Sequence, residues 1–209
     1  MSNYTGKFIT FEGSEGCGKS TQTQLLADHL KSLGVSVRLF REPGGVVISE
    51  KVRAILLDKA HAEMNRECET LLYMAARAQL VEEVVMPQLE AGAVLLCDRF
   101  LDSTVAYQGY GCGVDIEMIR TIGAFATRGI KPDLTFLLDL AVEEGLRRRG
   151  GNLDRIELRS LEYHNRVRQG YLDIARKEPG RVVVIDGRQS REEIFAIIKQ
   201  KVEPLLPAA

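Results

Sequence analysis

The stretch Gly13–Ser20 has the residue types and spacing that bind phosphate. It reads Gly-Ser-Glu-Gly-Cys-Gly-Lys-Ser and fits the pattern G-x-x-x-x-G-K-[ST] in full. Its glycines let successive backbone N–H groups turn toward an anion, and the helix expected from Ser20 adds its positive end. Lys19 would reach the β- and γ-phosphates, and the Ser20 hydroxyl would bind Mg²⁺. The stretch therefore predicts a site for ATP or another nucleoside triphosphate, with magnesium. The nucleotide-binding residues that we expect are Gly13, Ser14, Glu15, Gly16, Cys17, Gly18, Lys19, Ser20 and Thr21.

Further charged residues follow two apolar runs of strand length. Asp98 and Arg99 come directly after Val94–Cys97, and Arg41 follows Val35–Phe40. Because the carboxyl ends of parallel strands line the crevice of an open α/β sheet, Arg41 and Arg99 should converge there. Asp98 has the usual position of a carboxylate that binds Mg²⁺. The planar guanidinium of arginine suits phosphate, so this set indicates a phosphorylated acceptor rather than simple hydrolysis.

An arginine-rich segment lies at about residues 145–157. Its arginines could form a solvated helix face, or they could belong to a lid that closes over the triphosphate. The phosphate loop contains no arginine and has the acidic Glu15, so positive charge must come from elsewhere. This need favours the lid. We expect Arg149 to contact the transferred phosphoryl group, with Arg155 as the second choice.

Apolar runs alternate with segments of helical spacing along the chain. Continuous apolar runs of strand length are typical of strands buried on both faces of a parallel sheet. The predicted strands are Phe8–Phe11, Val35–Phe40, Val94–Cys97, Leu134–Leu138 and Val182–Ile185. The predicted helices are Ser20–Leu33, Glu50–Leu57, Glu67–Leu89, Ile116–Thr127, Val142–Arg149, Ile156–Arg176 and Ser190–Leu205. The alternation predicts a doubly wound α/β fold, with a five-stranded parallel sheet and helices on both faces. With no linker or internal repeat, we expect one domain over residues 1–209.

The composition excludes several classes of partner. The chain has 209 residues, of which 45% are hydrophobic and 27% charged, and its formal net charge is −1. No overall electrostatic field therefore attracts nucleic acid or an anionic membrane. No segment is long and apolar enough to span a membrane. The 4 cysteines have no C-x-x-C spacing, which indicates reduced thiols. We expect a cytoplasmic protein.

Several motifs together resemble those of the bacterial thymidylate kinases, which are P-loop nucleoside monophosphate kinases. The resemblance extends from about Lys7 to Leu205. The motifs that carry it are Phe11–Thr21, Arg41–Gly45, Tyr73–Arg77, Asp98–Gly109 and Leu153–Glu157. It implies a three-layer P-loop kinase fold with a short arginine-rich lid. It also implies Mg²⁺-dependent transfer of the ATP γ-phosphate to dTMP, giving dTDP and ADP for dTTP biosynthesis. Members of this family are commonly homodimers.

The resemblance also assigns roles to individual residues. Tyr73 would stack on thymine, Arg77 would donate to the thymine O4, and Thr104 and Gln108 would contact the base. Tyr107 would crowd the 2′ position of the sugar. The acceptor phosphate would be bound by Arg41, Arg53 and Arg99. The 3′-hydroxyl of the acceptor sugar would be bound by Glu15. The predicted catalytic residues are Lys19, Arg99, Arg149, Arg155 and Glu15, and the predicted metal ligands are Ser20 and Asp98.

Two other functions share the phosphate loop. A P-loop switch would bind partner proteins in a nucleotide-dependent way, but the chain has no N-K-x-D guanine motif and lacks the extra lysine of partitioning ATPases. A kinase for another nucleoside monophosphate, or for a nucleoside, is the other alternative. Asp98, Arg99 and Arg41 favour a phosphorylated acceptor, and Tyr73 with Arg77 favours thymine.

Overall fold

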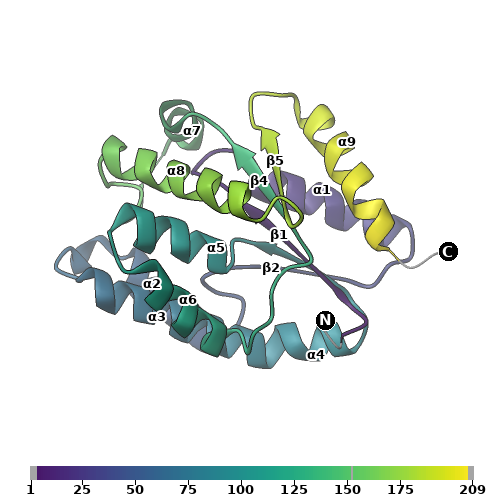
Figure 1. Ribbon diagram of the computed structural model, residues 1–209, viewed down its shortest axis with the longest axis horizontal. Helices are drawn as coiled ribbons and strands as arrows, with labels where there is room; N and C mark the ends of the chain where they lie inside the picture. Colours follow the sequence, from purple (N-terminus) through teal and green to yellow (C-terminus); the bar gives the residue numbers. More distant parts are fainter. Residues whose placement is uncertain (1–3, 152, 207–209) are drawn as a thin grey trace.

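The computed structural model describes residues 4–151 and 153–206 and contains one parallel β-sheet (Figure 1). The sheet has 5 strands in the order β2-β3-β1-β4-β5. The strands are β1 Lys7–Glu12, β2 Val37–Arg41, β3 Val94–Asp98, β4 Leu134–Asp139 and β5 Val182–Asp186. The five predicted strands and their parallel arrangement are confirmed. Residue 152 of the predicted lid, and residues 1–3 and 207–209 of the predicted domain, lie outside the described residues.

Helices cover both faces of the sheet, as predicted (Figure 1). On one face, α1 (Lys19–Ser32) packs beside α9 (Arg191–Val202), which continues into η4 (Glu203–Leu205). The elements of the other face and its surroundings are α2 Val47–Leu57, η1 Lys59–His61, α3 Arg66–Leu80, η2 Val81–Val85, α4 Met86–Glu90, α5 Leu101–Thr104, η3 Val105–Gly111, α6 Ile116–Ala126 and α8 Leu161–Lys177. Helix α7 (Val142–Arg149) lies at the carboxyl end of the sheet, next to α8. This arrangement gives the three layers of the predicted fold.

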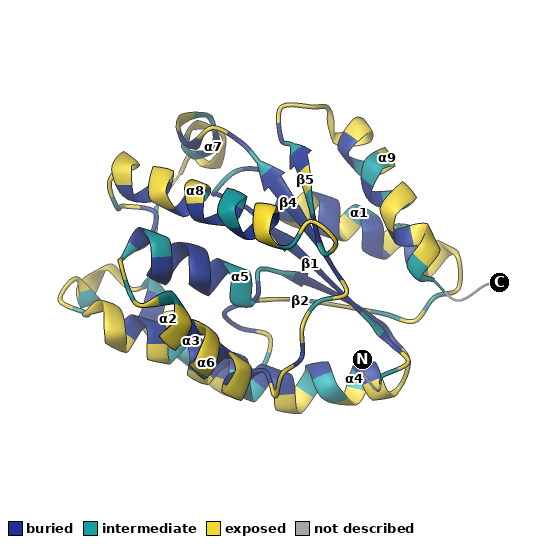
Figure 2. Ribbon diagram, viewed as in Figure 1, coloured by how far each residue is buried: buried dark blue, intermediate teal, exposed yellow. Residues whose placement is uncertain are grey.

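The apolar runs of the central strands serve two cores at once. Ile9 and Phe11 of β1 pack with residues of α1 and α9, whereas Phe8 packs with residues of η2 and α4 on the opposite face. Neighbouring residues of a strand point to opposite faces, so a strand covered on both sides has no polar alternation. The two edge strands are less protected: Leu39 of β2 is 42% exposed and Val184 of β5 is 47% exposed. Figure 2 shows the buried strands between helices whose outer surfaces are exposed.

Every strand of this sheet ends in a charged residue one position beyond the predicted run. These residues are Glu12, Arg41, Asp98, Asp139 and Asp186. The carboxyl edge is thus polar, while the body of the sheet is apolar. Asp98 of β3 is in register with Phe11 of β1 and with Arg41 of β2. The sheet therefore brings the ends of three strands together at the start of the phosphate loop.

One predicted helix needs correction, and one helical stretch was missed. Helix α8 begins at Leu161 and not at Ile156, because Ser160 caps it by accepting a hydrogen bond from the Tyr163 N–H. The helical stretch α5–η3, Leu101 to Gly111, was not predicted. Its valine, threonine, tyrosine and glycine residues have low helix propensity, and burial among the other elements stabilises it instead.

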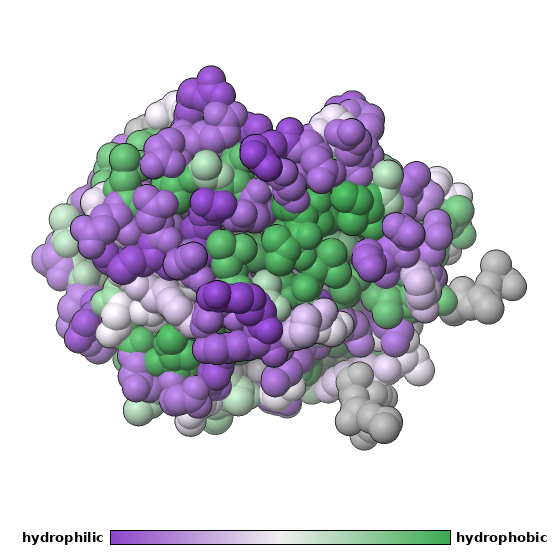
Figure 3. Space-filling view, turned by 45° about the horizontal axis from the view of Figure 1, so that its top comes forward, coloured by the Kyte–Doolittle hydropathy of each residue, from purple (hydrophilic) through white to green (hydrophobic). Residues whose placement is uncertain are grey.

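Figure 3 shows one face of the molecule, where hydrophilic residues surround a group of hydrophobic residues near the centre. Among residues 4–151 and 153–206, no helix combines the length and the hydropathy needed to cross a membrane.

Candidate active site

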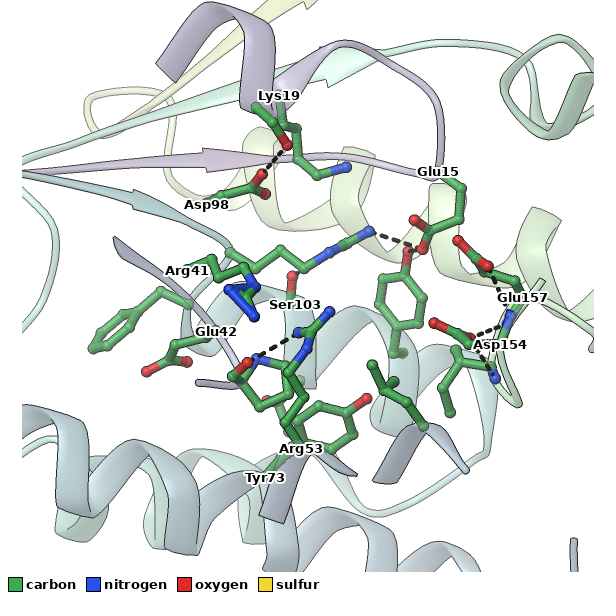
Figure 4. Close-up of a pocket in the computed structure, with 18 of the residues that line it drawn as sticks. Glu15, Lys19, Arg41, Glu42, Arg53, Tyr73, Asp98, Ser103, Asp154 and Glu157 are labelled. Atoms are coloured by element: carbon green, nitrogen blue, oxygen red, sulfur yellow. Dashed lines mark hydrogen bonds and ion pairs between the residues drawn. The ribbon is translucent and has the colours of Figure 1, made fainter. Parts of the chain in front are cut away.

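A cavity of about 450 Å³ opens at the carboxyl ends of β1, β2 and β3. The predicted site residues that line it are Glu15, Gly16, Gly18, Lys19, Ser20, Thr21, Arg41, Arg53, Tyr73, Arg77, Asp98, Arg99, Thr104, Tyr107, Gln108 and Arg149. Figure 4 shows Lys19 and Asp98 on one side of this cavity, with Arg53 and Tyr73 across from them. Most of the residues predicted to bind the two nucleotides thus face one common space, whereas Gly13, Ser14 and Cys17 of the phosphate loop do not line it.

The phosphate loop joins β1 to α1, as the motif predicts. Gly13, Gly16 and Gly18 have φ values of 135°, 65° and 97°, which other residues adopt at a cost. Lys19 bends back into the loop, where its Nζ donates to the carbonyl oxygens of Gly13 at 3.1 Å and Ser14 at 2.8 Å. The ammonium group is therefore already within the loop that would surround a phosphate.

Arg99 and Glu15 form the charged centre of the cavity. The Arg99 Nη2 lies 2.8 Å from Glu15 Oε1, and the guanidinium stacks over the Tyr107 ring at 4.9 Å. The Tyr107 hydroxyl donates to the same Glu15 oxygen at 2.6 Å. Burial alone would raise the pKa of Glu15, but Arg99, Lys19 and the Tyr107 hydroxyl lower it to about 2. Glu15 is therefore ionised at neutral pH.

The backbone of Arg99 is strained as well. Its φ of 72° is in the left-handed region, which is uncommon for a residue with a side chain and concentrates at functional sites. The Arg99 N–H donates to the Phe11 carbonyl oxygen at 3.0 Å, and its Nη1 donates to the Gly13 carbonyl oxygen at 3.1 Å. Arg99 is thus tied to β1 by its backbone and to the phosphate loop by its side chain.

Arg41 and Arg53 supply positive charge on the other side of the cavity. Arg53 of α2 donates from Nη1 to the Pro43 carbonyl oxygen at 2.9 Å, and the Glu42–Pro43 peptide bond that precedes this oxygen is cis. Burial, and then the neighbouring Arg41, lower the pKa of Arg53. Two guanidinium groups that repel each other in this way favour a bound anion between them.

The side chain of Arg77, on α3, is almost completely buried. Its side chain is 2% exposed, and Nε donates to Glu42 Oε2 at 2.7 Å while Nη2 donates to the Phe100 carbonyl oxygen at 3.1 Å. The sequence motif places Tyr73 one helical turn earlier on α3, and both residues line the cavity. Arg77 therefore contributes to the wall of the cavity as half of a buried ion pair.

Two buried polar atoms at this wall have no hydrogen-bond partner among the described residues. They are the Thr104 Oγ1 and the Glu42 Oε1, and both residues line the cavity. An unpaired buried polar atom is costly, so a native structure keeps one where a ligand, a water or an ion completes it. Their position indicates where a polar ligand would be recognised.

The predicted lid begins with α7, which packs directly on the phosphate loop. A Cβ on Gly16 would lie 2.0 Å from the Gly145 carbonyl oxygen, and a Cβ on Gly145 would lie 2.3 Å from the Glu15 carbonyl oxygen. Only glycine permits this approach. Arg149, at the end of α7, lines the cavity and donates from Nε to Glu157 Oε1 at 2.7 Å.

The structure does not bring Arg155 into the cavity. Its Nε donates to the Leu56 carbonyl oxygen at 2.8 Å, and its Nη2 lies 2.6 Å from Glu69 Oε2. The cause is local: Asp154 Oδ1 accepts the N–H groups of Ile156 and Glu157, which turns the chain and directs Arg155 inward. Of the two arginines considered, Arg149 has the position that the prediction requires.

Several acidic residues of the site were assigned no role from sequence. Glu42 pairs with Arg77 and Glu157 pairs with Arg149. Glu12 is buried and accepts from the Phe100 N–H at 2.7 Å and the Ser103 hydroxyl at 2.6 Å. Burial, and then Asp102, raise the pKa of Glu12 to about 7. Each follows or lies within a motif already noted, but only the fold reveals its partner.

Ser20 and Asp98 lie together at the mouth of the phosphate loop. The Ser20 hydroxyl donates to Asp98 Oδ2 at 2.6 Å. A hydroxyl and a carboxylate are oxygen ligands of the type that Mg²⁺ prefers, and Mg²⁺ takes its other ligands from water and phosphate. No cluster of three or more His, Cys, Asp or Glu side chains suited to a metal occurs among residues 4–151 and 153–206. The pair fits a magnesium ion that arrives with a nucleotide.

A phosphate loop that faces a group of arginines across one cavity defines a P-loop phosphotransferase with a phosphorylated acceptor. The thymidylate kinase family model matches residues 11–198. A thymidylate kinase from Geotalea daltonii is 51% identical, over 90% of this chain and 92% of the relative. One from Roseiflexus castenholzii is 49% identical, over 95% and 93%.

The fold comparison agrees with the sequence comparison. A crystal structure of thymidylate kinase from Ehrlichia chaffeensis has a TM-score of 0.78 and 34% identity, and the match covers 94% of this chain and 98% of that one. The chain therefore belongs to the thymidylate kinase family, and it is a phosphotransferase of the nucleoside monophosphate kinase class. The family identified from sequence is confirmed.

Proposed function

We propose that this protein transfers the γ-phosphate of ATP to dTMP, giving dTDP and ADP, in the cavity described above. The observation that carries the proposal is that the phosphate loop and the arginine-lined pocket open into one space of about 450 Å³. A transferred phosphoryl group could then pass between two bound nucleotides without leaving the protein. The whole chain acts as one domain in this proposal, with residues of about 145–157 as its lid.

The donor phosphates bind in the phosphate loop. Lys19 leaves the Gly13 and Ser14 carbonyl oxygens and pairs with the phosphates, while the loop N–H groups hold their oxygens. Arg149 stabilises the charge on the transferred group, because phosphoryl transfer depends on positioning and charge compensation. Its bond to Glu157 holds it at the edge of the cavity.

Magnesium would be held by Ser20 and Asp98 beside the donor phosphates. When bound there, the ion neutralises phosphate charge and helps to orient the triphosphate. The fit rests on the two oxygen ligands that the fold brings within 2.6 Å of each other.

The acceptor nucleotide occupies the opposite side. Arg41, Arg53 and Arg99 bind its phosphate, and Tyr73 stacks on thymine. At the sugar, Glu15 binds the 3′-hydroxyl and Tyr107 excludes a 2′-hydroxyl. At the base, Arg77 donates to O4, and Thr104 and Gln108 supply further polar contacts. The unpaired Thr104 hydroxyl supports this placement, since a base edge would complete it.

One assay tests the activity. The protein is mixed with ATP and Mg²⁺ and with each nucleoside monophosphate in turn, and ADP release is followed. We expect turnover with dTMP and little with dCMP. ATP hydrolysis without an acceptor, or equal rates with dCMP and dTMP, would refute the proposal.

A homodimer is part of the same proposal. Exposed apolar side chains lie on α2, α3 and α6, and α3 packs against both of the other helices. The residues concerned are Val47, Ile48, Ile55, Leu71, Met118 and Phe125. A second copy would cover such a surface. Sedimentation should give twice the mass of the monomer, and a monomer at micromolar concentration would contradict this.

The cytoplasm, which supplies ATP, is the location that we propose.

A further inference from the structure

Glu69 of α3 is a carboxylate buried behind the base side of the cavity. Its side chain has no exposed surface, and both oxygens are used. Oε2 lies 2.6 Å from Arg155 Nη2 and 2.6 Å from Arg159 Nη2. Oε1 accepts a hydrogen bond from Gln108 Nε2 at 2.9 Å. One residue thus connects the end of the lid and the turn after it to a residue that lines the cavity.

The charge of Glu69 determines how the amide of Gln108 must be oriented. A carboxylate that forms ion pairs with two guanidinium groups accepts hydrogen bonds and donates none. Only the NH₂ end of the Gln108 amide can therefore face Glu69. The Oε1 end must point the other way, and no donor to it is found among residues 4–151 and 153–206.

The free end of this amide belongs to the base pocket. Gln108 is 1% exposed and lines the same cavity as Tyr73, Arg77 and Thr104. A carbonyl oxygen presented there, on a side chain that is itself buried, is a fixed hydrogen-bond acceptor. Such a group selects ligands that offer a donor and penalises those that offer a second acceptor.

We propose that Glu69 is a positioning residue that fixes the Gln108 carbonyl oxygen toward the base, so that the site selects pyrimidines with an N3–H. Thymine and uracil carry this proton, whereas N3 of cytosine is an acceptor. The inference rests on the proposed function, since it takes dTMP as the occupant of the pocket. It assigns selectivity against cytosine to a residue that does not itself line the cavity.

A purely structural role for Glu69 makes different predictions. In that case the carboxylate only neutralises Arg155 and Arg159, and its loss lowers stability without changing the choice of base. Replacement by glutamine separates the two roles, because a glutamine at this position can accept or donate. The Gln108 amide is then free to turn over and offer its NH₂ group to the base.

The test measures kcat and KM for dTMP and dCMP in four proteins: the unaltered chain, Glu69→Gln, Gln108→Met and the double variant. Glu67→Gln is the matched control, since it is the same change on the same helix at an exposed carboxylate that pairs only with Arg66 among the described residues. We expect Glu69→Gln to lower the dTMP/dCMP ratio of kcat/KM by at least about tenfold, mainly through KM. Glu67→Gln should leave the ratio unchanged.

The double variant identifies the route of the effect. If Glu69 acts through Gln108, adding Glu69→Gln to Gln108→Met should not lower the ratio further. An unchanged ratio in a folded Glu69→Gln protein would overturn the inference, and so would a loss that persists in full beside Gln108→Met. Absence of dTMP turnover in the unaltered chain would instead refute the proposed function.

A second substitution covers the possibility that the neutral variant does not fold. Glu69→Asp keeps the charge between Arg155 and Arg159 but withdraws the carboxylate from Gln108 by one methylene. We expect this variant to melt close to the unaltered chain and still to lose selectivity against dCMP. A folded Glu69→Asp protein with full selectivity would overturn the inference.

Discussion

Substitution of Gly145 by alanine tests whether the contact between α7 and the phosphate loop is needed for catalysis. The added Cβ would lie 2.3 Å from the Glu15 carbonyl oxygen, whereas ordinary contact begins at 3.4 Å. The atom that the new Cβ meets is a backbone oxygen, so no flexible side chain can move aside. Helix α7 must therefore retreat from the loop by about 1 Å, the difference between these two distances.

The expected effect on rate follows from this displacement. Arg149 is four residues further along the same helix, so it moves with the backbone. A misplacement of about 1 Å near a reacting group can reduce the rate by about 100-fold. We expect kcat to fall by about tenfold to 100-fold, with a smaller change in KM for dTMP, because α7 carries none of the residues proposed to bind dTMP.

The effect on stability should be modest. Alanine removes a helix penalty of about 1 kcal/mol. The steric overlap costs about 1–3 kcal/mol, so the net loss is at most about 2 kcal/mol. For a chain of this length, that corresponds to a decrease in Tm of at most about 8 °C.

The assay is ADP release with saturating ATP and dTMP, together with a thermal unfolding curve. Gly180→Ala is the control, because a Cβ there has no atom within 4 Å and should change neither quantity. If Gly145→Ala keeps kcat within twofold of the unaltered protein, the close approach of α7 has no catalytic role and the reasoning fails.

Three further predictions concern single residues of the site. Lys19→Ala should abolish turnover with little loss of fold, and a grossly unfolded variant in circular dichroism would contradict this. Arg77→Ala should lower the free energy of unfolding by about 3–5 kcal/mol in urea, because it leaves Glu42 buried and unpaired, and a loss below 1 kcal/mol would contradict the ion pair. Burial raises the pKa of Glu12 from 4.5 to about 7, so the folded state holds a proton that the unfolded state has lost. Its contribution to stability therefore falls as pH rises from 4.5 to 7, and Glu12→Gln should flatten that slope in urea unfolding.

The sheet was predictable because its strands are buried on both faces. The run Phe8–Phe11 has no polar alternation, and its residues do pack in two cores. The stretch from Leu101 to Gly111 was not predictable in the same way. Its residue types favour strands or turns, and only the surrounding elements stabilise its helical form.

Site residues were predictable where they directly follow a strand or belong to a motif of consecutive residues such as the phosphate loop. Asp98 and Arg41 lie together because both end neighbouring parallel strands. The choice between Arg149 and Arg155 was open, because the course of the backbone in the loop after Gly150, and with it the direction of the Arg155 side chain, does not follow from the sequence. The role of Glu69 could not be predicted, because its partners Gln108 and Arg155 are distant in sequence.

The folded-back position of Lys19 has a consequence for the thermodynamics of nucleotide binding. An ammonium ion in water must lose its hydration shell before it can contact a phosphate, and that loss opposes binding. The Lys19 side chain has already exchanged water for the Gly13 and Ser14 carbonyl oxygens during folding. Arrival of a triphosphate then exchanges one set of oxygen partners for another, stronger set. The free-energy cost of dehydrating this cation is therefore part of the folding equilibrium, and it does not lower the affinity for ATP.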